Sequence, residues 1–443
     1  MKKIVIITAL SVALMMLTIF FYILQDSQNK FTLKIKSSIS KESRYFIKNN
    51  INTYLNNFGI KLKFKSNFEL ISSEGKIYNI NEYNNIFLDY QGPRSYLGLW
   101  DNKLFLVSGT GIIAFTDIED LIKNKSFKLN SINTNLKDIV KYDDFFLNSN
   151  YGIKGILIDK NSIYISLSNK LRDDCYNISI LKSEINLENL KFSYLFNPNQ
   201  CVNKINDYGE FQPIQSGGAM SEFDDHHFLL TTGEFRYRDY AQSDESIFGK
   251  VLLINKKTGN YNLISKGHRN SQGIYYDKKK GVILSTEHGP MGGDEINLNK
   301  NLFNKNNYGW PISSYGEHYP TMTPENAYQK APLHKSHSKY GFIEPIKYFV
   351  PSIGITQILK VDNSFGYVDF QNYFFSSMGY EDRDNAMSIH QIVFDENYDS
   401  IIFEDKIKIN HRVRDIIFIP QLKILVGYLE KRGSIITISY YEN

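Results

Sequence analysis

The sequence has no excess of either charge and no long run of like charges. Its 443 residues contain 51 Lys and Arg against 47 Asp and Glu, a formal net charge of +4. Basic runs such as residues 278–280 are short and lie beside turn residues, so we interpret them as solvated turns and expect no nucleic-acid partner. The apolar fraction of 42%, with 31 Tyr and 30 Phe, excludes a disordered chain and allows a large core.

Cysteine is also scarce, and Cys175 and Cys201 are the two in the chain. In an exported domain they could form a single disulfide, and two unpaired buried thiols are the alternative.

Long hydrophobic runs are missing except near the N-terminus, where residues 4–24 carry no charge. About 20 apolar residues span a bilayer, whereas the apolar core of a signal peptide usually has about 7–15. No small-x-small cleavage motif follows, so we interpret residues 1–25 as an uncleaved signal anchor rather than a cleaved peptide. Lys2 and Lys3 should stay cytoplasmic, which sends the rest of the chain to the outer, periplasmic or extracellular, side. Residues 26–85 are interpreted as a spacer with a juxtamembrane helix between about 34 and 65.

From residue 86 onward the sequence lacks long helical periodicity, and short apolar strands alternate with Gly, Asn and Asp. An apolar strand that ends in small residues, preceded by a tight turn and another strand, occurs six times. The copies begin at Leu104, Ile163, His227, Val282, Tyr373 and Ile424. A propeller blade takes about 40–50 residues. Residues 86–443 are therefore predicted to form an all-β, six-bladed β-propeller with an insertion at about 299–344.

The first strand of each propeller blade lines the central channel, so the residues that open these strands should meet at one channel mouth. These residues are Ser95 or Tyr96, Asn150, Gln215, Arg269 with Asn270, Ser352 or Thr356, and Arg412 with Arg414. Three guanidinium groups in one cavity repel one another unless an anion lies between them. The pattern predicts a shared site for a polar, anionic small molecule.

Three blocks of sequence carry a family resemblance: "GHRNSQG" from residue 267, "EHGPMGGDEINL" from 287 and "NNYGWP" from 306. In this order they resemble the glucose/sorbosone dehydrogenase family, the soluble quinoprotein sugar dehydrogenases. The resemblance implies a six-bladed propeller that holds pyrroloquinoline quinone (PQQ) with calcium at the channel mouth. It also implies oxidation of a sugar hydroxyl by hydride transfer to the quinone.

The resemblance also assigns cofactor contacts. Arg269 and Asn270 match the pair that contacts the quinone oxygens, and Arg412 and Arg414 match two arginines that pair with the carboxylates of the cofactor. Asn150 stands where the family commonly has a glutamine in the second blade.

Metal contacts follow from the same resemblance. Gly289 and Pro290 match the positions whose backbone carbonyls bind the calcium of the cofactor, and carbonyl oxygens suit this hard cation. Asp294 and Glu295 match an acidic pair near a second, structural calcium.

Two positions depart from the family pattern. Gln215 stands where the family has its general-base His, and Ser377-Met378-Gly379 replaces an S-L-K pattern that supplies a lysine. An amide cannot take up the proton of a sugar hydroxyl near neutral pH. The histidines of the insertion, such as His318, are candidate substitutes, but a polar-loop interpretation is favoured for them. The sequence leaves two functions open, a PQQ-dependent aldose dehydrogenase with altered catalysis and a non-catalytic propeller that binds an anionic or calcium-dependent ligand.

Overall fold

The computed structural model describes residues 60–84, 94–205, 211–319, 329, 331–367, 370–380 and 382–440. The predicted signal anchor and most of the predicted juxtamembrane helix lie outside these ranges. Within them, no helix has the length and apolar character needed to cross a membrane. Residues 60–443 form one compact unit.

The described strands form five sheets, the largest with ten strands. Its order is β25 (Val413–Ile419), β26 (Ile424–Leu429), β27 (Ser434–Tyr440), β2 (Ile77–Asn84), β1 (Ile60–Ile71), β6 (Phe127–Thr134), β5 (Ile113–Asp117), β4 (Lys103–Ser108) and β3 (Ser95–Trp100), with β10 (Asn189–Leu190) beside β6.

The other four sheets each begin with a strand that pairs antiparallel with the next strand along the chain. The first is β7 (Ile153–Asp159), β8 (Ser162–Arg172), β9 (Cys175–Glu184) and β11 (Ser193–Phe196). The second is β12 (Gly217–Glu222), β13 (His227–Thr232), β14 (Lys250–Asn255), β15 (Tyr261–Lys266) and β19 (Asn306–Asn307). The third is β16 (Ser271–Asp277), β17 (Val282–Glu287), β18 (Asp294–Asn299) and β20 (Lys347–Phe349). The fourth is β21 (Ile355–Lys360), β22 (Gln371–Ser377), β23 (Ser388–Phe394) and β24 (Ile401–Lys408).

Helices are few and short among the described residues. They are α4 (Leu136–Ile139), α5 (Asp143–Leu147) and the 3-10 turns η1 (Ile118–Ile122), η2 (Arg238–Ala241), η3 (Ser338–Tyr340) and η4 (Asn363–Phe365). The predicted all-β class is confirmed.

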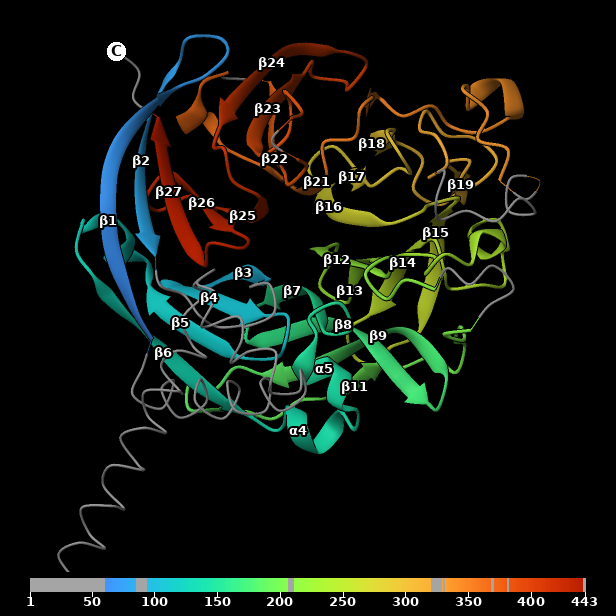
Figure 1. Cartoon of the computed structure of the whole chain (residues 1–443), viewed down its shortest axis with the longest axis horizontal. Coiled ribbons are helices and arrows are strands. Elements are labelled where there is room, and N and C mark those ends of the chain that lie inside the picture. Colours follow the sequence, from blue (N-terminus) through green and yellow to red (C-terminus); the bar gives the residue numbers. More distant parts are fainter. Residues whose placement is uncertain are drawn as a thin grey trace, which may run out of the picture. The chain divides into compact units, whose positions relative to one another are not determined.

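Six first strands pack side by side in a closed ring: β3, β7, β12, β16, β21, β25 and again β3. Figure 1 looks down this ring, and the sheets radiate from it. Glycines allow the close approach of neighbouring strands. A Cβ on Gly155 of β7 would lie 2.4 Å from the carbonyl oxygen of Gly218 on β12, and one on Gly273 of β16 would lie 2.7 Å from that of Thr356 on β21. Such distances are too short for any side chain, so these positions keep the ring tight.

The six apolar strands predicted from the sequence are all present, as β4, β8, β13, β17, β22 and β26. The predicted turns precede them. Asp101 and Lys160 adopt positive φ angles of 52° and 51° at the β3–β4 and β7–β8 turns, which two-residue hairpins with primed turns require.

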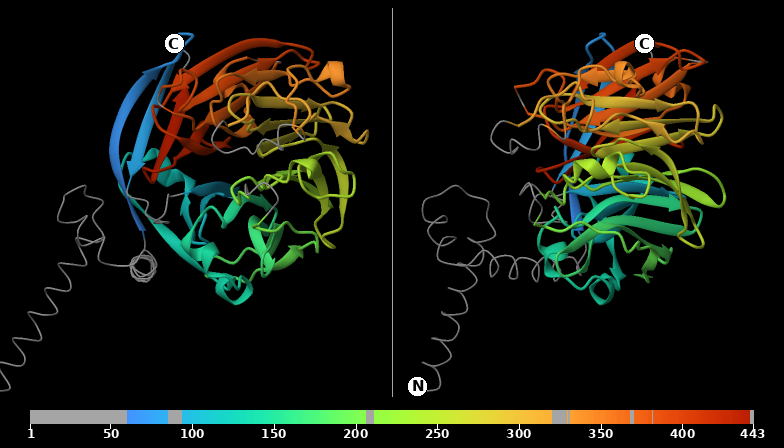
Figure 2. Two further views of the ribbon diagram at one scale, coloured as in Figure 1. Left: turned by 45° about the vertical axis from the view of Figure 1, so that its right-hand side comes forward. Right: turned by 90° about the vertical axis from the view of Figure 1, so that its right-hand side faces the viewer.

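The predicted domain boundary at residue 86 is wrong, because β1 and β2 belong to the sheets. β2 pairs antiparallel with the C-terminal strand β27, and the first residues of β1 pair with β6. Figures 1 and 2 show β1 and β2, in blue, beside β27, in red. The last residues of the predicted helix, from 60 onward, are therefore strand. The physical cause is an alternation in "IKLKFK", where Leu62 is buried and the neighbouring lysine Lys63 is exposed.

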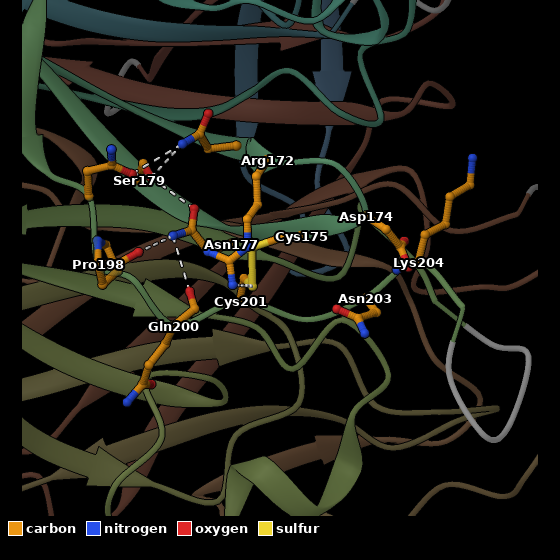
Figure 3. Close-up of a disulfide and its surroundings, with 12 residues drawn as sticks. Arg172, Asp174, Cys175, Asn177, Ser179, Pro198, Gln200, Cys201, Asn203 and Lys204 are labelled. Atoms are coloured by element: carbon orange, nitrogen blue, oxygen red, sulfur yellow. Dashed lines mark hydrogen bonds between the residues drawn. A yellow bond between two sulfur atoms is a disulfide. The ribbon is translucent and has the colours of Figure 1, made fainter.

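A disulfide joins Cys175, at the start of β9, to Cys201, in the segment after β11, with a Cα–Cα distance of 5.3 Å (Figure 3). The Asn177 side chain donates to the carbonyl oxygens of Pro198 and Gln200 beside it. The bond and these contacts hold the segment after β11 against its own sheet.

Candidate functional site at one end of the strand ring

Contacts between neighbouring first strands join equivalent positions near their starts, which places these starts at one end of the ring. The Thr356 hydroxyl of β21 donates to the carbonyl of Val413 on β25, and the Leu97 amide of β3 donates to the Asp415 carboxylate of β25. Since the strands run in parallel and in register, the polar residues that open them share one end, as the sequence predicts.

Gln215 lies at the centre of a buried polar cluster. We assign the orientation of its amide from these neighbours: Nε2 donates to Glu234 Oε1 at 2.9 Å, and Oε1 accepts from Arg269 Nη2 at 3.0 Å and from Arg236 Nε at 3.1 Å. Glu234 and Arg236 come from the turn after β13, and neither was singled out in the sequence. We call Gln215, Glu234, Arg236 and Arg269 the Gln215 cluster.

Glu234 is the acidic member of this cluster and is fully buried. Burial raises the pKa of Glu234 to about 7, although Arg269, Arg238 and Arg236 lower it. Its Oε2 atom has no hydrogen-bond partner among the described residues. A carboxyl whose pKa lies near 7 is partly protonated and partly ionised at neutral pH.

Arg269 connects the Gln215 cluster to the Gly-Pro turn. Its Nη1 donates to the carbonyl oxygens of His288 at 3.0 Å and Gly289 at 2.7 Å, and its guanidinium lies 5.4 Å from the ring centroid of Trp310. Asn270 is buried next to it and accepts from the Gly217 amide at 3.1 Å. The structure therefore brings the predicted residue pair together with the predicted turn.

A second group, which we call the cationic cluster, lies where β25, β3 and β7 begin. It consists of Arg94, Lys154, Arg412, Arg414 and the carboxylate Glu430. Arg414 binds one oxygen of Glu430, and Arg412 Nη2 lies 3.1 Å from the other. Burial alone would raise the pKa of Glu430, but Arg414, Arg94 and Arg412 outweigh it and lower the pKa to about 2.

Lys154 adds an amine to the cationic cluster that the sequence did not predict. It is buried, and its ammonium donates to the backbone carbonyls of Asn150 at 2.6 Å and Ser149 at 3.2 Å. Burial, together with Arg94 and Arg414, lowers its pKa well below the usual value. Asn150 thus contributes its backbone carbonyl to hold Lys154, and the predicted cofactor contact of its side chain stays a prediction.

The Gln215 cluster and the cationic cluster both act electrostatically on His288. Burial lowers the pKa of this histidine, and the charges of Arg269 from one cluster and Arg414 from the other lower it further. Both clusters therefore act on one region of the strand ring.

The acidic residues predicted to lie near calcium have other partners. Asp294 Oδ1 accepts from the Gly289 amide at 3.1 Å, and Oδ2 accepts from the amides of residues 353, 354 and 355 at 2.7–3.1 Å. Glu295 is buried 3.3 Å from His337 Nε2. No group of three or more His, Cys, Asp or Glu side chains in the described part of the chain is arranged for a metal ion. Asp294 therefore fixes the backbone of two turns.

A buried Ser-His-Glu arrangement lies nearby. His268 is 2.8 Å from both Ser265 Oγ and Glu287 Oε2, and none of the three lines the cavity that Gln215 and Arg269 share. A cavity of about 1350 Å³ lies at the other ends of the six first strands and is lined by none of the predicted site residues. Neither feature competes with the two clusters as the candidate site.

Comparisons with known proteins agree with this geometry. Residues 110–437 match the family described as Glucose / Sorbosone dehydrogenase. The Aldose sugar dehydrogenase YliI of Escherichia coli is 26% identical over 238 residues, which cover 50% of this chain and 59% of that protein. An uncharacterized protein of Synechocystis is 32% identical over 197 residues, covering 42% and 43%. The chain thus matches about half the length of these two relatives.

Solved structures show the same fold. The soluble aldose sugar dehydrogenase of Escherichia coli, in its apo form, has a TM-score of 0.59 at 19% identity and covers 82% of this chain and 100% of that one. The PQQ-bound aldose sugar dehydrogenase of Streptomyces coelicolor has a TM-score of 0.54 at 15% identity, covering 82% and 98%. The match to the family spans most of the sequence, and the chain belongs to the glucose/sorbosone dehydrogenase family.

Proposed function

We propose that this protein is a PQQ-dependent sugar dehydrogenase that acts on aldoses. The observation that carries the proposal is the surplus of positive charge, buried or half-buried, at one end of the strand ring. Arg94, Arg412 and Arg414 act on the carboxylate of Glu430, and Lys154 lies near Arg94 and Arg414. Burial raises the pKa of Asp415, the other carboxyl near Arg414, to about 7, so it offsets less of this charge. Buried charges of one sign are costly unless a counter-charge binds. A tricarboxylate cofactor provides this charge.

The proposal includes the architecture and the location. In this proposal the ten-stranded sheet consists of two blades. One blade contains β3, β4, β5 and β6, and the other contains β25, β26, β27 and β2. Strand β1 pairs with both β2 and β6 and so joins the two blades. With the four smaller sheets, this division gives six blades. Residues 4–24 anchor the protein in the membrane, and the propeller faces the periplasmic or extracellular side, because the run is uncharged and follows two lysines.

The described residues fit PQQ as follows. Arg412, Arg414 and Lys154 would hold its carboxylates, and Arg269 and Asn270 would contact its quinone oxygens. The Lys154 amine would be charged beside the carboxylates of the cofactor, because a nearby anion raises its pKa, and it would compensate for the missing lysine of the S-L-K pattern. When bound, PQQ supplies the two-electron acceptor for a hydride from the sugar carbon.

Calcium fits less well. The Gly289 carbonyl already accepts from Arg269, and the Pro290 carbonyl accepts from the Ser352 hydroxyl at 3.3 Å. A guanidinium and a divalent cation would compete for the same oxygen. The contribution of calcium is measured directly in the following experiment.

The full-length protein is titrated with PQQ, with and without calcium, while its thermal unfolding is followed. We expect stabilisation of about 2.7 kcal/mol when free PQQ reaches about 100 times Kd. Lys154→Met should weaken PQQ binding by about tenfold or more, because it removes a cation that faces the carboxylates. Lys160→Met, at the exposed end of the same strand, is the matched control and should bind as the wild type does. The absence of any shift in the wild type would refute the proposal.

The second candidate, a propeller that binds its ligand without turnover, is favoured by Gln215 at the position of the general base. Sugar oxidation with an artificial electron acceptor separates the two. PQQ binding without any oxidation of aldoses would support the non-catalytic protein.

A further inference from the structure

We propose that Glu234 is the proton acceptor of this site, in place of the histidine that Gln215 replaces. The inference rests on the proposed function, since it concerns the same sugar oxidation. It adds a residue that the sequence motifs did not indicate.

Geometry is the first argument. Glu234 Oε1 is held at 2.9 Å by Gln215 Nε2, so the amide that cannot accept a proton orients a carboxylate that can. Oε2 makes no hydrogen bond with any described residue. Both residues line a cavity of about 10 Å³ together with Arg269, Pro290 and Trp310. This volume is about that of one water molecule, and a general base acts directly or across one water.

The backbone around Glu234 is the second argument. The Glu234 amide donates to the carbonyl of Arg269 at 3.1 Å, which ties the turn after β13 to the start of β16. The next two residues, Phe235 and Arg236, have positive φ angles of 51° and 69°. Two consecutive non-glycine residues in the left-handed region are strained, and such strain persists where the surroundings impose it, often at functional sites.

Charge is the third argument. Arg236 and Arg238 from the same turn and Arg269 from the start of β16 face Glu234, and His318 and Tyr319 line the cavity from the segment after β18. Full burial opposes ionisation and the three arginines favour it, which leaves the pKa of Glu234 near 7. A base is most effective when its pKa lies near the working pH.

The sugar hydroxyl would give its proton to the Glu234 carboxylate, and the hydride on the same carbon would pass to the bound quinone, the two-electron acceptor. The C–O single bond would become a carbonyl, and Glu234 would later release its proton to solvent.

The test compares full-length wild type with Glu234→Gln, which keeps the shape and removes the carboxylate. Glu222→Gln, at the exposed far end of β12, is the matched control. We expect Glu234→Gln to retain the thermal shift with PQQ and to lose about 10²–10⁴-fold in sugar oxidation, the usual contribution of a general base. Glu222→Gln should retain both. Glu234→Asp keeps a carboxyl group and should recover part of the rate. It takes the place of Glu234→Gln in the comparison if the Gln variant does not fold.

A measurement without cofactor tests the titration itself. The folded-state pKa of Glu234, about 7, lies above the unfolded value of about 4.3. The protonated carboxyl therefore stabilises the folded protein below about pH 4.3, and this contribution is lost as the pH rises to about 7. The melting temperature of Glu234→Gln minus that of wild type should therefore increase as the pH rises from 5 to 7. A constant difference would overturn the assignment.

The outcomes separate the two proposals. If PQQ does not bind the wild type, the proposed function and the assignment of Glu234 both fail. If PQQ binds and Glu234→Gln still oxidises sugar within tenfold of wild type, the assignment alone fails, and His288 and His318 become the candidates. If the wild type binds PQQ but is inactive until Gln215 is replaced by His, Glu234 is not the proton acceptor.

Discussion

Replacing Glu430 by Gln is expected to lower the free energy of unfolding of the cofactor-free protein by about 3–5 kcal/mol. Glu430 is buried between Arg414 and Arg412, and Arg94 acts on it as well. Without the carboxylate, Arg414 and its neighbouring guanidiniums lose their ion-pair partner and keep Asp415 as the nearby acidic group. Breaking a buried pair on one side costs more than the pair itself contributes. Thermal or urea unfolding at neutral pH measures the loss.

Its control is Glu404→Gln, in a surface pair with Lys347, where about 0–1 kcal/mol is expected because water screens exposed charges. Equal effects of the two variants would contradict the buried cluster. PQQ should stabilise Glu430→Gln more than it stabilises wild type, since its carboxylates supply the missing charge.

The pH dependence of the Glu430 effect has a defined sign. Its folded-state pKa, about 2, lies below the unfolded value of about 4.3. The carboxylate therefore stabilises the protein above about pH 4.3, and this stability is lost as the pH falls towards 2. The difference between wild type and Glu430→Gln should shrink over this acidic range.

Removal of the Cys175–Cys201 disulfide is expected to cost about 3–4 kcal/mol. The bond closes a loop with a sequence separation of 26 residues, and a cross-link of this length restricts the unfolded chain by about that amount. The double variant Cys175→Ser, Cys201→Ser should show a lower melting temperature than wild type under oxidising conditions. Reductant should destabilise wild type and leave the double variant unchanged. A wild type insensitive to reductant, with no loss in the double variant, would contradict the structural role.

Local patterns in the sequence were enough to predict the second strand of each repeat. The apolar repeat and the turn residues predicted β4, β8, β13, β17, β22 and β26, because strand alternation and hairpin turns depend on neighbours along the chain. The blocks around Arg269 and Gly289 also indicated the family, which the match over residues 110–437 confirms.

The sequence did not predict that β1 and β2 belong to the ten-stranded sheet, because their pairing depends on distant parts of the chain. β1 and β2 have clear alternation, but their partners are β6 and the C-terminal β27, far away in the chain. The same limit applies to the disulfide, for which the sequence left a pair and two free thiols equally open.

The sequence by itself determined the strand repeat, the all-β class, the family and the set of arginines that open the first strands. The tertiary structure decided which groups these arginines meet. It placed Glu234 against Gln215, Lys154 in the cationic cluster and the Asp294 carboxylate on backbone amides. These contacts join different strands of a closed ring, so they arise from strand packing and burial, and no spacing within one segment of the chain encodes them.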